Sequence, residues 1–127
     1  MSDSPNKQIL VVEDDDDARQ LLCIMLKSLN YEPVDFSSGA ETLANLEEIN
    51  PVIIMLDVMM PEMNGYELLA DLKKQDKFKD LPTIMVTAKD HDDDVMEGYQ
   101  HGADYYITKP YTLNQIQYAV ELYTSES

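Results

Sequence analysis

Five polar side chains follow short apolar runs of the sequence and could do chemistry together. They are Glu13, Asp14, Asp57, Thr87 and Lys109. The apolar runs before them are typical of buried strands, and ligands of open parallel sheets bind where the strands end. Three carboxylates, one hydroxyl and one ammonium group should therefore meet at one edge of a sheet.

An acidic cluster of this kind needs a cation. Two carboxylates about 4 Å apart repel each other by roughly 4 kcal/mol at an effective dielectric constant near 20. Mg²⁺ suits hard oxygen ligands, and it typically binds one or two protein carboxylates, several waters and a phosphate. With the charge neutralised, Asp57 could attack phosphorus, Lys109 could neutralise the transferring oxygens, and Thr87 could donate a hydrogen bond to one of them.

Several of the acidic side chains also have a purely structural interpretation. Asp15–Asp17 and Asp92–Asp94 are typical of helix starts, where aspartates cap backbone N–H groups and favour the positive end of the helix dipole. Asp57 differs because it lies between apolar Val52–Leu56 and Val58–Met60, where a carboxylate without a function would be costly. A turn-forming role for Asp57 is the alternative.

The elements that must position these side chains alternate along the chain. Apolar runs rich in β-branched or aromatic residues predict strands over Ile9–Val12, Val52–Leu56, Thr83–Val86 and Tyr105–Thr108, with Tyr31–Phe36 as a weaker fifth. Helical spacing predicts helices from about residue 18 to 29 and over 38–49, 64–75, 92–100 and 112–123. Because the strand runs are apolar at consecutive positions, both faces of the sheet should be covered. The order predicts an α/β fold, a doubly wound five-stranded parallel sheet with five helices.

Two of these helices carry a clear apolar stripe. The stripe of the first consists of Ala18, Leu21, Leu22, Met25, Leu26 and Leu29, and that of the last of Leu113, Ile116, Val120 and Tyr123. Residues three and four apart share a helix face. We expect these side chains to pack against the sheet.

Length and charge limit the possible functions. The chain has 127 residues and a formal net charge of −16, which disfavours direct binding to nucleic acids or anionic membranes. It contains neither a signal peptide nor an apolar run of the roughly 20 residues that span a bilayer, so we expect a cytoplasmic protein without membrane insertion. Residues 8–124 should form one domain, with flexible ends at 1–7 and 125–127.

Four stretches in this order resemble the receiver domain of two-component response regulators. They are Ile9–Asp14, Met55–Gly65, Val86–Ala88 and Gly102–Pro110. The resemblance extends from Gln8 to about Tyr123, and it implies the flavodoxin-like strand order 2-1-3-4-5 of the chemotaxis regulators.

The resemblance also implies roles for individual residues. Asp57 would accept a phosphoryl group from a phosphohistidine on a sensor histidine kinase or histidine phosphotransfer protein. The Mg²⁺ ligands would be Asp14 and Asp57 directly, Glu13 through water, and the backbone carbonyl of Met59. Lys109 would contact the phosphoryl oxygens, and the peptide bond before Pro110 would be cis. Thr87 and Tyr106 would move together as the switch.

Partner surfaces are a further expectation. Tyr118 and Leu122 lie opposite the stripe of the last helix, and with Tyr105 they could contact a downstream target protein or a fused output domain. Scattered surface apolar residues are the alternative. Ile24 lies off the stripe of the first helix, where receivers dock their phosphoryl donor, although an ordinary tertiary contact would also explain it. The sequence leaves open whether the receiver stands alone or belongs to a longer protein.

Two other functions compete with that of an active switch. A phosphorylation-independent pseudo-receiver would be an interaction module with a vestigial site, but the five polar residues are all present. A turnover hydrolase with an aspartate nucleophile would need a second acid two residues after Asp57, where Met59 stands. We therefore expect a protein that catalyses its own phosphorylation and dephosphorylation but is not a turnover enzyme.

Overall fold

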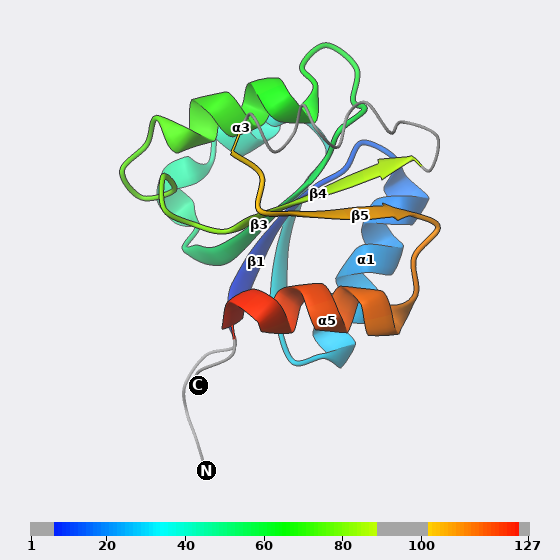
Figure 1. The fold of residues 1–127 in the computed structure, drawn as a ribbon. Coiled ribbons are helices and arrows are strands. Elements are labelled where there is room, and N and C mark those ends of the chain that lie inside the picture. The colour runs from blue at the N-terminus through cyan, green and yellow to red at the C-terminus, as the bar shows by residue number, and fades with distance from the viewer. Residues whose placement is uncertain (1–6, 89–101, 125–127) are drawn as a thin grey trace.

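A five-stranded parallel sheet forms the centre of the molecule. The computed structural model describes residues 7–88 and 102–124. The strands are β1 (Gln8–Val12), β2 (Glu32–Phe36), β3 (Pro51–Asp57), β4 (Thr83–Ala88) and β5 (Tyr105–Lys109). Their order in the sheet is β2-β1-β3-β4-β5 (Figure 1). The strand order and the five predicted strands are confirmed, with boundaries that differ by one to two residues.

Helices cover both faces of this sheet. They are α1 (Asp16–Ser28), α2 (Gly39–Leu43), a 3₁₀ turn η1 (Leu46–Glu48), α3 (Gly65–Lys73) and α5 (Leu113–Thr124). Figure 1 shows α1 and α5 on one face and α3 on the other. Among the described residues, no helix has the length and apolar character that crossing a membrane would require. The helix expected over residues 92–100 and the flexible ends, apart from Lys7, lie outside the described residues.

Two apolar clusters join the helices to the sheet. One packs Leu22 and Leu26 of α1 and Ile116 and Val120 of α5 against alternate positions of β1 and β3. The other packs α3 against the opposite face of the same strands. Burying one Leu or Ile side chain contributes roughly 1.5–3 kcal/mol, so these clusters hold the strand ends in fixed register.

The predicted stripes are wrong at two positions. Leu21 is 49% exposed and Leu113 is 41% exposed. Leu21 is one residue, and so about 100° around the helix, from the buried Leu22. Leu113 is the first residue of α5 and lies at the end of the buried stripe.

The single helix predicted over residues 38–49 is also wrong, because the chain breaks it after Leu43. The side-chain amide of Asn45 donates to the Glu41 carbonyl at 2.8 Å, while the Asn45 backbone N–H donates to Thr42 at 3.0 Å. Asparagine therefore takes the acceptor that the next helical bond would use. A short 3₁₀ turn follows instead.

Helix α3 begins with a capping box directly after the loop that follows Asp57. The Asn64 side chain accepts from the Glu67 backbone N–H at 2.9 Å, and the Glu67 carboxylate accepts from the Asn64 N–H at 2.9 Å. Both bonds satisfy backbone donors that the helix itself cannot satisfy.

Replacing Asn64 with Ala should lower the free energy of unfolding by about 1 kcal/mol, because the cap is lost. Urea denaturation of both proteins measures this difference. Asn114→Ala, in the exposed first turn of α5, is the control. An Asn64→Ala protein as stable as the control would contradict the role of the capping box.

Candidate metal and phosphoryl site

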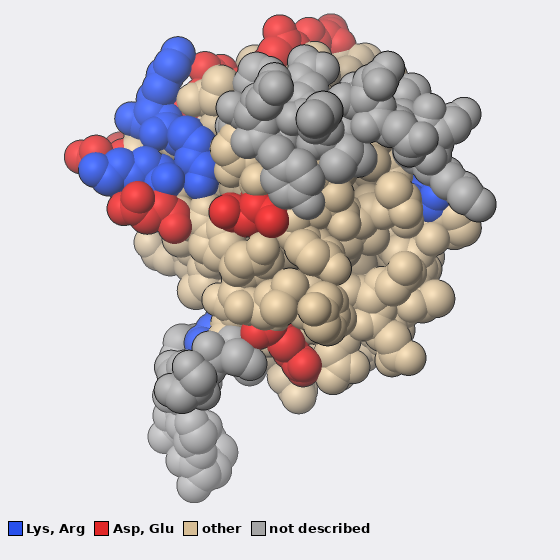
Figure 2. All heavy atoms as spheres, viewed as in Figure 1, with Lys and Arg blue, Asp and Glu red and all other residues tan. Residues whose placement is uncertain are grey.

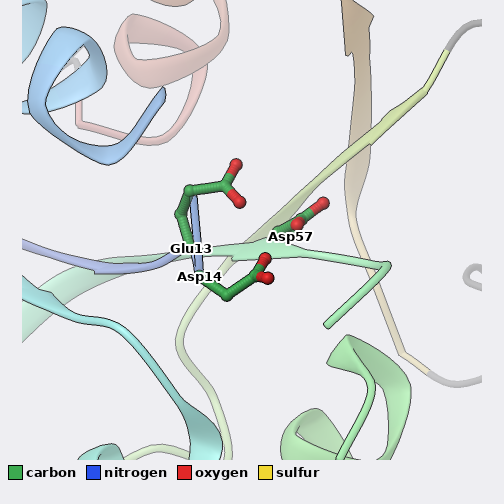
Figure 3. A group of neighbouring side chains, drawn as sticks. All are labelled: Glu13, Asp14 and Asp57. Carbon is green, nitrogen blue, oxygen red and sulfur yellow. The ribbon is translucent and has the colours of Figure 1, made fainter. Parts of the chain in front are cut away.

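Three carboxylates meet at the carboxyl edge of the sheet. One oxygen from each of Glu13, Asp14 and Asp57 can be chosen so that all three lie within 4.8 Å of one another. Figure 3 shows the three side chains projecting into the same space, Glu13 and Asp14 from the end of β1 and Asp57 from the end of β3. Glu13 and Asp57 are buried and Asp14 is exposed, so the cluster is open to solvent on one side.

The backbone after β1 fixes the first two carboxylates. The Glu13 N–H donates to the Phe36 carbonyl at 3.2 Å and continues the pairing of β1 with β2. The Asp15 side chain then caps α1 by accepting from the Ala18 N–H at 2.8 Å. The predicted capping role within Asp15–Asp17 is thus confirmed for Asp15.

Asp57 is the last residue of β3 and is held by the loop that follows it. The Met59 N–H donates to its Oδ1 at 3.4 Å, and the Gly65 N–H closes the loop onto the Val58 carbonyl at 2.9 Å. A Cβ on Gly65 would collide with the Asp57 carbonyl oxygen and would lie 2.9 Å from the Met85 methyl carbon. Glycine is therefore required where α3 approaches Asp57.

Lys109 reaches the carboxylates from the end of β5. Its Nζ lies 2.7 Å from Oε1 of Glu13 and 3.7 Å from Oδ1 of Asp57. Burial alone would lower the pKa of Lys109, but the hydrogen bond to Glu13 and the charge of Asp57 raise it overall. The ammonium group is therefore charged and lies directly beside Asp57. The Lys109–Pro110 peptide bond is cis.

The single positive charge of Lys109 does not neutralise the three carboxylates of this site. Burial, and then the hydrogen bond and charge of Glu13, raise the pKa of Asp57 from an ordinary value of 3.8 to about 8, against the opposing effect of Lys109. The ionised cluster is thus unfavourable in the protein alone. Oxygen ligands with one solvent-exposed side fit a divalent cation such as Mg²⁺.

Thr87 brings a hydroxyl to the same edge. Its register position in β4 is opposite Thr108, one residue before the pair formed by Ala88 and Lys109. Within the described part of the chain its buried Oγ1 has no hydrogen-bond partner, as is also true of Thr83. A buried hydroxyl without a hydrogen-bond partner lowers the stability of the fold, so the Thr87 hydroxyl is available to donate a hydrogen bond to an oxygen of a ligand.

Tyr106 contacts a residue that sequence reasoning missed. Its hydroxyl is hydrogen-bonded to the hydroxyl of Tyr66, which is buried at the start of α3. The ring also packs against the cluster on that face of the sheet. Tyr66 directly follows Gly65, so this bond joins β5 to the loop that holds Asp57.

The expected partner residues lie in two places. Ile24 is 64% exposed on α1, and Tyr118 and Leu122 are 59% and 48% exposed on α5. The rings of Tyr105 and Tyr118 lie 6.3 Å apart. They line a pocket of about 280 Å³ between β5 and α5, together with Tyr106, Ile107, Thr108, Asn114 and Gln115.

Comparison with known proteins identifies the type of domain. A family model described as the response regulator receiver domain matches residues 9–121. The chain is 34% identical over 110 residues to the phosphate regulon transcriptional regulatory protein of Escherichia coli, covering 87% of this chain and 48% of that protein. It is 37% identical over 116 residues to the alkaline phosphatase synthesis transcriptional regulatory protein of Bacillus subtilis, covering 91% and 48%. The chain spans about half the length of these relatives.

Solved structures show the same fold. A chemotaxis protein of Vibrio cholerae has a TM-score of 0.87 with 26% identity, covering 93% of this chain and 98% of that one. The receiver domain of a signal transduction histidine kinase from Syntrophus aciditrophicus has a TM-score of 0.84 with 33% identity, covering 94% and 90%.

Replacing Asp57 with Asn should raise the stability of the metal-free protein at pH 8. A carboxyl with a raised pKa in the folded state contributes stability below about pH 4, and that contribution is lost as the pH rises toward 8. The advantage of the variant should therefore be smallest at pH 4 and largest at pH 8. Thermal melting in EDTA across this range measures it, and an advantage that did not grow with pH would contradict the electrostatic description.

Proposed function

The chain belongs to the response regulator receiver domain family, and we propose that it is a phosphorylation-activated switch of a two-component phosphorelay. Receiver domains are signalling switches rather than metabolic enzymes. They take phosphoryl groups from histidine kinases and regulate output domains. The observation that carries the proposal is the position of Lys109, with its Nζ 2.7 Å from Glu13 and 3.7 Å from Asp57, beside the three carboxylates. The phosphoryl group would come from a phosphohistidine.

The proposed metal is Mg²⁺, held directly by Asp14 and Asp57, by Glu13 through water, and by the backbone carbonyl of Met59. When bound, it would neutralise the carboxylates and the phosphoryl oxygens, so that two anionic groups can approach each other. The carboxylates are close enough to share one ion, and the raised pKa of Asp57 supports the need for a further cation.

In the proposed transfer, an Asp57 oxygen attacks phosphorus as the P–N bond of the phosphohistidine breaks. The electron pair of that bond stays on the imidazole, which leaves, and an acyl phosphate forms on Asp57. Lys109 would shift its charged Nζ toward the phosphoryl oxygens, because its present partners are the carboxylates of Glu13 and Asp57. The hydroxyl of Thr87 would donate to one phosphoryl oxygen, which would satisfy its hydrogen-bonding capacity.

Thr87 and Tyr106 would carry the switch. Both residues lie on the paired strands β4 and β5, and Tyr106 is bonded to Tyr66 beside the loop of Asp57. A phosphoryl group that binds Thr87 would favour one of two arrangements of these strands, since a ligand shifts an equilibrium through its different contacts with the two states. We propose the face of Tyr105, Tyr118 and Leu122 as the surface that a target protein or output domain contacts.

Nucleic acid is not the proposed partner of this domain. The formal net charge is −16. On the face in Figure 2, Lys and Arg gather chiefly at one side, and acidic side chains lie beside them. Among the described residues on that face, the basic side chains are confined to one group with carboxylates beside it, whereas proteins that bind phosphate backbones typically use an extended basic surface.

Incubation with phosphoramidate and Mg²⁺ tests the proposed function. The protein should gain one phosphoryl group, measured by intact mass spectrometry, and Asp57→Ala should gain none. No gain by the wild-type protein would favour a phosphorylation-independent pseudo-receiver. Release of many equivalents of phosphate from varied substrates would instead indicate a hydrolase.

Ile24→Asp should slow phosphoryl transfer from the cognate histidine donor by about tenfold, because a charge would enter an apolar contact of about 1.4 kcal/mol. Its phosphorylation by phosphoramidate, which needs no docking, should stay unchanged. Leu122→Asp on α5 is the matched control for an added surface charge. Equal transfer rates for the two variants would remove Ile24 from the donor surface.

A further inference from the structure

Arg19 joins three segments beside the acidic cluster. Its guanidinium donates to the Glu13 carbonyl oxygen at 2.9 Å, to Oδ1 of Asp16 at 2.7 Å and to Oδ2 of Asp35 at 3.1 Å. These groups belong to the loop after β1, the first turn of α1 and β2. The planar guanidinium, unlike an ammonium group, can direct separate N–H groups to all three.

The bond to the Glu13 carbonyl differs from the two ion pairs. Asp16 and Asp35 have carboxylates that are 76% and 44% exposed, and exposed ion pairs typically contribute little to stability. Glu13 is buried, and it is the residue at which the chain leaves β1. The most buried of the three contacts is thus the one with the backbone carbonyl of Glu13, a residue of the carboxylate site.

That contact completes the fixation of the Glu13 backbone. Its N–H is held by the Phe36 carbonyl at 3.2 Å, and its carbonyl is held by Arg19. The position of this carbonyl is set by the ψ angle of Glu13, so a rotation about the Cα–C bond of Glu13 would break the bond to Arg19 and would move the Asp14 carboxylate relative to Glu13 and Asp57. Five consecutive acidic residues, 13 to 17, repel one another here and would favour such a rotation.

We propose that Arg19 is a positioning residue of the site, which holds the Glu13–Asp14 peptide so that both carboxylates face Asp57. This inference rests on the proposed function, because it concerns the affinity of the same three carboxylates for Mg²⁺. Arg19 would act through the backbone and would touch neither the metal nor the phosphoryl group. Residues that orient metal ligands in this way typically change metal affinity by about 10–100-fold when they are replaced.

The direction in which the Mg²⁺ affinity changes when Arg19 is replaced distinguishes a positioning role from a purely electrostatic effect of its charge. Arg19 is a cation near a cation-binding site, so removing its charge should by Coulomb's law strengthen Mg²⁺ binding. Loss of a purely structural ion pair would lower stability and leave the affinity unchanged or slightly increased. Only a role in holding the carboxylates predicts that binding becomes weaker when a positive charge is lost.

The experiment compares two variants of α1 that each lose one positive charge. Arg19→Gln removes the three contacts, whereas Lys27→Gln removes an exposed charge in the last turn of the same helix. Isothermal titration with MgCl₂ should give a Kd about tenfold higher for Arg19→Gln than for wild type. Lys27→Gln should bind as tightly as wild type or slightly more tightly.

A third variant, Asp35→Asn on β2, removes one ion pair of Arg19 but keeps the bond to Glu13. Its Kd for Mg²⁺ should stay within about twofold of wild type, since a single exposed ion pair contributes little.

A second measurement reports on the loop without metal. Hydrogen exchange of the Glu13 amide in EDTA should be faster in Arg19→Gln and unchanged in Lys27→Gln. If Arg19→Gln does not fold, Arg19→Lys provides the same test, because it keeps the charge but cannot bond to all three partners. Its Mg²⁺ affinity should also be reduced.

Mg²⁺ binding by an Arg19 variant that equals or exceeds wild-type affinity would overturn the positioning role. Failure of the wild-type protein to bind Mg²⁺ would instead overturn the proposed function and the inference with it. The two failures are therefore distinguishable in the same titration.

Discussion

Three carboxylates at one edge of the sheet repel one another, and the surrounding contacts must hold them against that repulsion. Glu13 and Asp57 are 5% and 6% exposed, and one oxygen of each lies within 4.8 Å of the other and of one Asp14 oxygen. Lys109 compensates part of this charge but leaves the pKa of Asp57 raised. Binding of a divalent ion would relieve this repulsion, and in the proposed function the ion would in turn attract an anionic phosphoryl group.

The fold keeps this unfavourable arrangement in place. Apolar clusters on both faces of the sheet fix the strands, and the strands end where the polar residues begin. Short connections then aim the side chains: the capping box at Asn64 and the close approach of Gly65 hold Asp57, while Arg19 and the Phe36 carbonyl hold Glu13. The bond between Tyr66 and Tyr106 connects the same loop to β5, where the proposed partner surface lies. In the proposed function, these contacts would couple the charge at Asp57 to the shape of the surface formed by β5 and α5.

The sequence allowed most of the sheet and the grouping of the site to be predicted, for a physical reason. Runs without alternation that are rich in β-branched residues, such as Val52–Leu56, are typical of strands buried on both faces, and parallel strands bring their carboxyl ends together. The contacts of Arg19 and Tyr66 could not be predicted, because they join residues whose distance depends on the register of separate elements. The break after Leu43 depends on which acceptor the Asn45 amide selects, and Leu21 was misplaced because helical spacing alone does not fix the width of the buried face.

The most direct test of the account is the melting temperature as a function of Mg²⁺ concentration, compared with NaCl at equal ionic strength. Any cation screens a net charge of −16, so only the excess effect of Mg²⁺ reports on the carboxylate site. If the three carboxylates bind Mg²⁺ in the folded state only, this excess should grow with the logarithm of the Mg²⁺ concentration above Kd. Superimposable curves for the two salts would contradict it.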